Sequence, residues 1–341
     1  MPMPPDPLDP AWNERLTEAM LAVLGRASDG PHPDLDRFVE LQRDYPRRGG
    51  KHLRGRLVLA ATAAFGGDPS DAVPVAAALE LFQNWVLVHD DVEDDSEERR
   101  GAPALHRQVG IPLAVNVGDA MHVAMWRLLI DSDRPWRDAV LREFLTTIRT
   151  TAEGQHLDLS WVHEGRFGVG RDAYLGMVDR KTATYTVVAP LRLGAWIAGG
   201  EPPPTLTPAG LARGRAFQVR DDVLNLLPDA GGGYGKEFAG DLYEGKRTLV
   251  LAIAFERLTP GDADRLRTVL DHPRDRIGRE RVEEALRLIR SCGAIEEAQR
   301  FAEHSAEQGL ERLREALRDA PGRDAVAAIE RLVEDLASRA R

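Results

Sequence analysis

The sequence predicts an all-α fold, arranged as a single large helical bundle. Apolar residues recur with the period of a helix along nearly the whole chain, and glycine and proline clusters separate the periodic stretches. No stretch combines the alternating pattern and the β-branched enrichment of a strand ladder. We therefore expect one domain over residues 1–341, with a frayed, proline-rich start at residues 1–10.

The expected helices follow one another with short breaks. The breaks contain A-S-D-G-P-H-P at 27–33, F-G-G-D-P-S at 65–70, G-G-E-P-P-P at 199–204 and P-D-A-G-G-G-Y-G at 228–235. The expected helices cover residues 11–25, 34–44, 53–65, 72–97, 111–130, 136–160, 171–198, 207–227, 247–258, 262–271, 278–291, 294–317 and 322–339.

Composition excludes several classes of protein. With 341 residues, 43% apolar and 29% charged, the chain is typical of a globular protein with a large core. A net charge of −10 argues against a nucleic-acid partner, although a local basic pocket for an anion remains compatible with it. Cys292 is the only cysteine, so neither an intrachain disulfide nor a cysteine metal site is expected.

The chain shows no targeting pattern. Its start lacks a basic segment followed by an apolar one, and no apolar run approaches the ~20 residues that span a bilayer. We expect no transmembrane segment and a cytoplasmic location.

The stretch V-H-D-D-V-E-D-D-S-E-E-R-R-G at 88–101 is the first candidate site. Positions four apart share a helix face, so Asp90 and Asp94 point the same way, with Asp91 beside them. Like charges at that spacing repel by a few tenths of a kcal/mol unless a cation lies between them. A solvated acidic face is the alternative, and Arg99 and Arg100 follow closely.

A second acidic pair lies 131 residues further on, in F-Q-V-R-D-D-V-L-N-L-L at 217–227. Asp221 and Asp222 sit on an otherwise apolar helix, where buried carboxylates must be paired or bind a metal. An ion pair with Arg215 or Arg220 is the alternative. Oxygen ligands suit Mg²⁺, which commonly takes one or two carboxylates plus substrate phosphates.

Cations that could bind those phosphates occur at four places. Any one lysine is more commonly a solvated side chain, but together they indicate two anionic groups in one helical cavity, one of them held through metal. They are Lys51 with Arg54, Arg99 with Arg100, Lys181 beside Thr182, and Lys236 with Lys246.

These blocks and their order resemble the all-trans polyprenyl diphosphate synthase family, over nearly the whole chain. The matching blocks, in sequence order, are G-K-x-x-R, D-D-x-x-D with R-R-G, G-Q-x-x-D at 154–158, K-T, F-Q-x-x-D-D and G-K-x-x-x-x-D-L-x-E-G-K-x-T. The resemblance implies a bundle of the isoprenoid synthase type with a central cavity, working as a homodimer.

The resemblance also implies a prenyltransferase reaction, the Mg²⁺-dependent head-to-tail condensation of isopentenyl diphosphate with an allylic diphosphate. Several Mg²⁺ ions would link Asp90 and Asp94 to Asp221 on a facing helix and hold an allylic diphosphate, with Asp91 and Asp222 also in the metal set. Arg99, Lys181, Thr182, Gln218, Lys236 and Lys246 would contact that diphosphate. Isopentenyl diphosphate would be held without metal by Lys51, Arg54, Gln83 and Arg100. Asp90, Asp94, Asp221, Lys181 and Arg99 would be the catalytic set.

Product length is predicted less directly. Asn225 replaces a third aspartate and, with E-D-D-S at 93–96, resembles the geranylgeranyl-forming branch. In the family, the residue at the position of Trp85 helps to form the floor of the cavity that receives the growing tail, so Trp85 with Val86 is our candidate for controlling product length. The alternative is that Trp85 is an ordinary core residue. We expect the twenty-carbon product, with farnesyl diphosphate as the alternative.

Three other classes of protein fit the sequence less well. A di-iron carboxylate bundle needs two E-x-x-H pairs, and only Glu153 and His156 have that spacing. A class I terpene cyclase needs no isopentenyl site, whereas Lys51, Arg54 and Arg100 predict one. A catalytically silent partner subunit would be expected to lose the aspartates, and both pairs are present.

Overall fold

The computed structural model describes residues 6–25, 30, 32–131, 133–227, 238–271 and 277–337. The chain forms two compact units. Unit 1 comprises Met1–Thr146, Val187–Leu206 and Arg314–Leu332, and unit 2 comprises Thr147–Thr186, Thr207–Leu313 and Val333–Arg341. The expectation of one domain over residues 1–341 stays a prediction, and the units are described separately.

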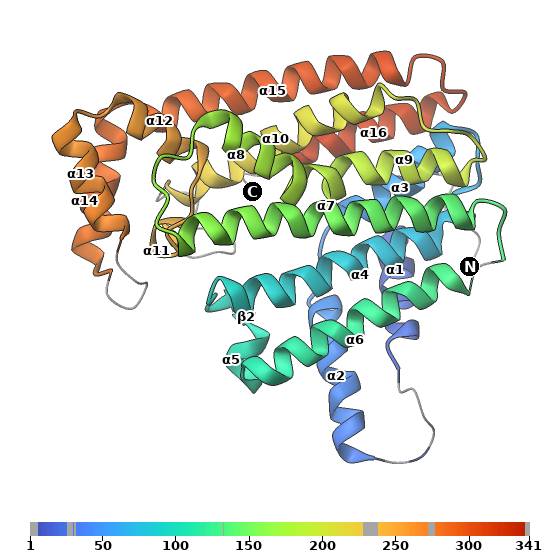
Figure 1. Cartoon of the computed structure of the whole chain (residues 1–341). Coiled ribbons are helices and arrows are strands. Elements are labelled where there is room, and N and C mark those ends of the chain that lie inside the picture. Colours follow the sequence, from blue (N-terminus) through green and yellow to red (C-terminus); the bar gives the residue numbers. More distant parts are fainter. Residues whose placement is uncertain are drawn as a thin grey trace. The chain divides into compact units, whose positions relative to one another are not determined.

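Unit 1 is built around α4 (Pro69–Glu93), which packs against α1, α3 and α6 (Figure 1). Asp68 caps α4 by accepting the Ser70 N–H, and Pro69 fits the first turn, where no helical donor is needed. The other elements are α1 (Ala11–Val23), α2 (Pro33–Arg47), α3 (Leu53–Ala64), β1 (Glu98–Arg99), β2 (Ala102–Pro103), α5 (Leu105–Val109), α6 (Ile111–Ile130) and α9 (Ala189–Ile197).

Unit 2 has its own apolar core, to which α8, α10, α12, α13 and α14 contribute. Trp161, Tyr174 and Val219 are among its buried members. The elements are α8 (Arg171–Val178), α10 (Leu206–Asn225), α11 (Gly240–Tyr243), α12 (Leu249–Arg257), α13 (Pro260–Leu270) and α14 (Arg279–Ser291). The first residue of α10, Leu206, is assigned to unit 1. Four further elements are also divided between the units: α7 (Arg137–His163), η1 (Asp179–Val188), α15 (Ala294–Ala316) and α16 (Arg323–Ala337).

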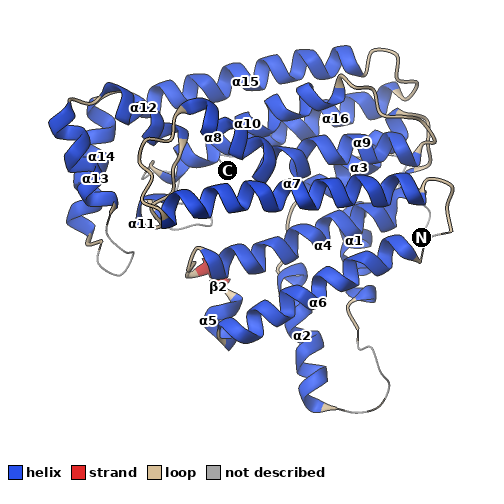
Figure 2. Cartoon of the chain, in the orientation of Figure 1, coloured by secondary structure: helices blue, strands red, loops and turns tan. Residues whose placement is uncertain are grey.

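The all-α prediction is confirmed, with three local differences. The stretch expected as one helix over 171–198 is α8, then the π-helix η1, then α9. The short helices α5 and α11 were not predicted. The hairpin of β1 and β2, drawn in red in Figure 2, was not predicted either. Each of its strands has two residues, which are too few to show an alternating pattern.

The beginning of the described chain is better held than the sequence suggested. The Trp12 indole donates to the Asp6 carbonyl at 3.0 Å, and the Arg56 guanidinium donates to the Leu8 carbonyl at 2.5 Å. Residues 6–10 therefore contact the rest of unit 1, whereas the expectation for residues 1–5 lies outside the described residues.

Two helices of unit 1, α4 and α6, are long and apolar enough to cross a membrane by length and composition alone. For α4, 61% of the apolar window is buried inside the protein, as in a core helix; for α6 the share is 39%. Helix α6 accordingly has apolar side chains at the surface, including Val123 and Ile130.

Candidate active site

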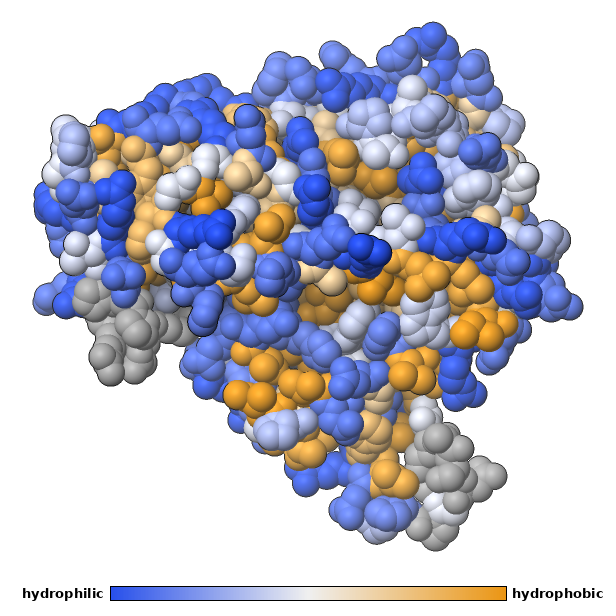
Figure 3. Space-filling model, in the orientation of Figure 1, coloured by the Kyte–Doolittle hydropathy of each residue, from blue (hydrophilic) through white to orange (hydrophobic). Residues whose placement is uncertain are grey.

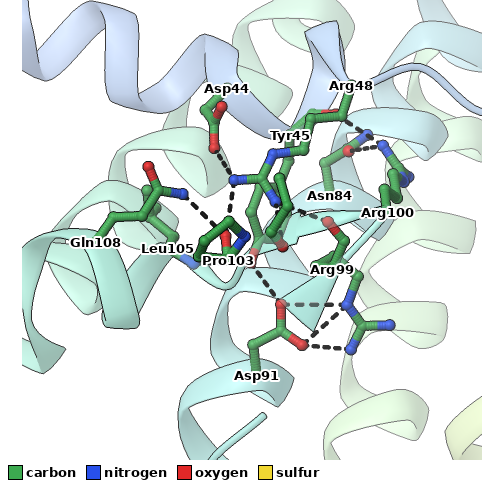
Figure 4. A network of polar contacts seen from close by, with 11 residues as sticks. Asp44, Tyr45, Arg48, Asn84, Asp91, Arg99, Arg100, Pro103, Leu105 and Gln108 are labelled. Atoms are coloured by element: carbon green, nitrogen blue, oxygen red, sulfur yellow. Dashed lines mark hydrogen bonds and ion pairs between the residues drawn. The ribbon is translucent and has the colours of Figure 1, made fainter. Parts of the chain in front are cut away.

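The first acidic pair occupies the last turn of α4, and its two members have different surroundings. Asp91 is fully buried, and its carboxylate accepts hydrogen bonds from the Tyr45 hydroxyl at 2.5 Å and from the Arg99 guanidinium (Figure 4). Asp90 keeps 18% of its side chain exposed and lies 3.7 Å from Arg99. Asp94 follows at the end of the helix and is also partly exposed.

Burial and charge together hold this network in one protonation state. Burial acts to lower the pKa of Arg99, but the adjacent Asp91 carboxylate outweighs burial and raises it. Burial and then Asp91 raise the pKa of Tyr45, so its hydroxyl remains a donor. Because both Asp91 oxygens already accept hydrogen bonds, this arrangement favours Asp90 and Asp94 over Asp91 for contact with a metal.

The predicted isopentenyl diphosphate residues gather partly within unit 1. Arg100 donates to the Asn84 side chain at 3.1 Å. Burial is the main cause that lowers the pKa of Arg100, and the nearby charges of Arg99 and Arg54 lower it further. A β-carbon on Gly50, next to the exposed Lys51, would lie 3.7 Å from the Arg100 guanidinium. Gln83 is a half-buried residue of α4, adjacent to Asn84.

A buried carboxylate holds the start of α3, which carries Arg54, and the residues just before it, which include Lys51. Glu80 of α4 accepts the Gly55 N–H at 2.8 Å, and its other oxygen lies 3.3 Å from the His52 ring. His52 has a left-handed backbone, with φ of 46°, and its ring also contacts the Thr17 hydroxyl at 3.1 Å. Burial acts to raise the pKa of Glu80, but His52 and Gly55 lower it overall.

The predicted chain-length residue Trp85 belongs to an aromatic stack between α4 and α6. Its ring lies parallel to His122 with a centroid distance of 4.0 Å, and the Trp126 indole donates to His122 at 2.9 Å. Phe82 meets Trp85 edge to face. Val86 is half-buried next to it. The His89 ring also meets Trp85 edge to face. Three neighbouring rings therefore define the orientation of Trp85.

The second acidic pair lies on α10 in unit 2. Asp222 is buried and accepts hydrogen bonds from the Tyr174 hydroxyl and from the Gln218 amide, the latter at 2.8 Å. Gln218 in turn accepts from the Thr182 hydroxyl at 2.9 Å. Burial first, and then the charge of Asp241, raise the pKa of Asp222 to about 8. Asp221 is only half-buried.

Lys181 and Thr182, the K-T block, lie in η1. Two residues of the G-Q-x-x-D block on α7, Gly154 and Asp158, contact Lys181 and fix its position. A β-carbon on Gly154 would lie 2.2 Å from the Lys181 backbone nitrogen, so only glycine allows this approach. Asp158, one turn on, pairs with the Lys181 ammonium at 2.5 Å. The π-helical turns that follow are typical of functional positions in helices.

The end of α10 connects to α11 through Asn225. Its side-chain oxygen accepts the Asp241 N–H at 3.1 Å, and its carbonyl accepts the Ala239 N–H at 2.8 Å. Asn225 therefore has a structural role that the sequence did not indicate. Lys246 lies 2.7 Å from Glu244, and Lys236 lies outside the described residues.

Within the described ranges, no three acidic, histidine or cysteine side chains converge into a ready metal site. The donors available in each unit are nevertheless hard carboxylate oxygens on half-buried residues, Asp90 and Asp94 in unit 1 and Asp221 in unit 2. Such small sets fit Mg²⁺, which completes its shell with water and phosphate oxygens.

Sequence reasoning missed several residues that support the site. Tyr45, Arg48 and Tyr174 are distant in sequence from the aspartates and arginines that they contact, so no motif pointed to them. Glu80 and Asn84 had a weaker signal, since both are polar residues in an apolar helix that carries Asp90.

Comparison with known proteins gives a consistent result. The family model described as polyprenyl synthetase matches residues 36–289. A short chain isoprenyl diphosphate synthase of Methanothermobacter thermautotrophicus is 36% identical, with 82% of this chain and 85% of that protein covered.

Solved structures agree over nearly the full length. A geranylgeranyl pyrophosphate synthetase from Pyrococcus horikoshii has a TM-score of 0.83 at 31% identity and covers 96% of this chain and 97% of its own. A geranylgeranyl pyrophosphate synthase from Corynebacterium glutamicum, complexed with isoprenyl diphosphate and magnesium, has a TM-score of 0.84 at 29% identity, with coverages of 99% and 100%.

Proposed function

The chain belongs to the polyprenyl synthetase family, and we propose that this prenyltransferase joins isopentenyl diphosphate head to tail to an allylic diphosphate. The proposal is supported by two acidic pairs that occur together with two candidate groups of cations. Arg54 and Arg100 are close to one another in unit 1, and Lys181, which pairs with Asp158, belongs with Lys246 to the group that the family resemblance implies. Two anionic substrates require two such groups, because a single diphosphate would need only one.

Unit 1 would act on the allylic diphosphate through Asp90, Asp94 and Arg99. When bound, Mg²⁺ supplies positive charge that stabilises the diphosphate as it departs. Arg99 would add a fixed cation whose position is maintained by Asp91. In this proposal Asp91 orients Arg99, and direct contact with metal falls to its neighbours.

The family resemblance assigns further contacts of the allylic diphosphate to residues that lie in unit 2. Asp221 would hold metal beside the buried Asp222, and Lys181, oriented by Asp158, would contact the phosphate oxygens. Thr182 and Gln218 already hydrogen-bond one another, so they would present a prepared polar surface. Lys246 and Lys236 complete the set that the family resemblance implies.

Isopentenyl diphosphate would be held by Lys51, Arg54, Gln83 and Arg100 without metal. The double bond of isopentenyl diphosphate would then attack the allylic carbon as its bond to diphosphate breaks. A proton would leave for the released diphosphate, which completes the condensation. A terpene cyclase is the second candidate, but it has no need for this additional cation group.

We propose geranylgeranyl diphosphate as the product, with farnesyl diphosphate as the alternative. The names of the two solved relatives support the twenty-carbon length. Trp85, held by His122, would set where the growing tail stops, with Val86 beside it.

The test is incubation with isopentenyl diphosphate, an allylic starter and Mg²⁺, followed by chain-length analysis of the product. Geranylgeranyl diphosphate is the expected outcome for the natural sequence, and Trp85→Ala should shift the product to longer chains. A cyclised hydrocarbon, or no consumption of isopentenyl diphosphate, would refute the condensation; an unchanged length in Trp85→Ala would refute the role of Trp85.

We also propose that the enzyme is a homodimer in the cytoplasm. In unit 1, large apolar side chains are exposed along α6, and orange atoms gather over α5 and α6 in Figure 3. A second copy is the occupant we favour, since a patch of this kind is typical of an interface. Light scattering coupled to size-exclusion chromatography should give twice the chain mass of 37.6 kDa; a monomer would refute it. The exposed residues are Ile111, Leu113, Val115, Val123 and Ile130, with Leu145 on α7.

A further inference from the structure

The two arginines assigned to the two diphosphates sit on a hairpin that has little stability of its own. Each strand has two residues, paired as Glu98 with Pro103 and Arg99 with Ala102. Arg100 and Gly101 both have positive φ, 53° and 74°, which is the backbone of a type I′ turn. A residue with a β-carbon disfavours this region, and so short a hairpin is not stable alone. Contacts from elsewhere must therefore hold Arg99 and Arg100 in place.

Arg48, just after the end of α2, supplies one set of these contacts. Its guanidinium donates to the carbonyl of Arg99 at 2.8 Å and to that of Pro103 at 3.0 Å, one on each strand (Figure 4). It is fixed from behind by Asp44 at 2.5 Å and lies over the Tyr45 ring, 4.7 Å from its centroid. Only 10% of the Arg48 side chain is exposed, and its guanidinium joins the two strands of the hairpin.

Tyr45 supplies the second set, through two different atoms. Its hydroxyl donates to Asp91, which binds Arg99, and accepts the Leu105 N–H at 3.1 Å. Its backbone carbonyl accepts a hydrogen bond from Arg100 at 2.7 Å. That carbonyl is available because it belongs to the last turn of α2, where helical carbonyls lack a partner of their own.

We infer that Tyr45 and Arg48 are positioning residues that set the places of both diphosphate-binding arginines from α2. Arg48 contacts both strands of the hairpin. The Tyr45 hydroxyl fixes the Arg99 side chain through Asp91, and the Tyr45 carbonyl fixes the Arg100 side chain directly. The inference rests on the proposed function, since Arg99 and Arg100 are assigned there to the allylic and isopentenyl substrates.

Because the contacts use different atoms of Tyr45, a side-chain substitution can affect the position of Arg99 without affecting that of Arg100. Tyr45→Phe removes only the hydroxyl, so the KM for the allylic diphosphate should rise about tenfold, the scale of a lost hydrogen bond to a charged group. The KM for isopentenyl diphosphate should stay within about twofold of the natural enzyme, since the carbonyl of residue 45 remains. Arg48→Gln should raise both KM values.

The matched control for Arg48→Gln is Arg43→Gln on the same helix. Arg43 also donates to backbone carbonyls, those of Leu24 and Leu21, but makes none of the hairpin contacts. Thermal unfolding of each variant measures general loss of stability. Arg48→Lys keeps the charge and loses the planar fork, so it should resemble Arg48→Gln in its KM values.

The outcomes discriminate between the possibilities. Equal changes in Arg43→Gln and Arg48→Gln, or unchanged KM values in Tyr45→Phe, would overturn the positioning role. If Arg48→Gln fails to fold, Tyr45→Phe and Arg48→Lys still decide the matter. An inactive natural enzyme would contradict the proposed condensation itself, whereas an active one with unaffected variants would contradict only this inference.

Discussion

The two acidic pairs of this protein share one arrangement and differ in how its charge is balanced. In each, the second aspartate is buried and accepts a hydrogen bond from a tyrosine: Asp91 from Tyr45 in unit 1, and Asp222 from Tyr174 in unit 2. Arg99 pairs directly with Asp91. Asp222 instead receives the neutral amide of Gln218 and is near the charge of Asp241.

The difference affects how each pair behaves without ligands. Asp91 is one partner of a built-in ion pair, so its charge is balanced before any substrate arrives. Asp222 has a pKa raised to about 8, first by burial, so near neutral pH the metal-free protein holds it largely protonated. In unit 1 the negative charge of Asp91 is thus already balanced by Arg99. In unit 2 a bound cation would have the larger effect, because it would favour the charged form of Asp222.

The largest expected effect concerns the first member of each pair. Asp90→Ala and Asp221→Ala should each lower Mg²⁺-dependent turnover by about 10³ or more, because each loses charge stabilisation of the leaving diphosphate. Circular dichroism should show unchanged helical content, since both side chains are only half-buried. Activity near the natural level in either variant would remove that residue from the proposed metal set.

A stability effect distinguishes the buried member of the first pair. Asp91→Asn would leave Arg99 in a largely buried position, where the more distant Asp90 is its one remaining acidic partner among the described residues. Breaking a buried ion pair in this way costs roughly 3–5 kcal/mol of unfolding free energy. Urea denaturation measures it, and a loss below about 1 kcal/mol, the range of exposed pairs, would show that the pair is not structurally important.

The smallest expected effect belongs to the buried member of the second pair. The folded pKa of Asp222 is above its ordinary value, so between about pH 4 and 8 the folded state binds more protons than the unfolded one. This group therefore reduces stability as the pH rises through that window. Asp222→Asn should leave stability at pH 7 unchanged or higher and flatten its pH dependence, as followed by thermal unfolding in EDTA. A variant much less stable than the natural chain at pH 7 would contradict the raised pKa.

Much of the fold was predictable because its helices carry their own local information. The predicted 111–130 coincides with α6, and the other long helices were located within a few residues. Predictions failed where local information was absent. The π-helix η1 depends on the close approach of α7 at Gly154, and the hairpin at 98–103 depends on Arg48 of α2.

The amino-acid sequence by itself determined the helical class, the two acidic pairs and the set of cations, because residue type and spacing along one helix are sufficient for these. Only the tertiary structure decided which aspartate of each pair is buried, which groups balance its charge, and what holds Arg99 and Arg100. The physical reason is that burial and hydrogen bonding depend on partners such as Tyr45 and Tyr174, which lie 46 and 48 residues away along the chain from the carboxylates they contact.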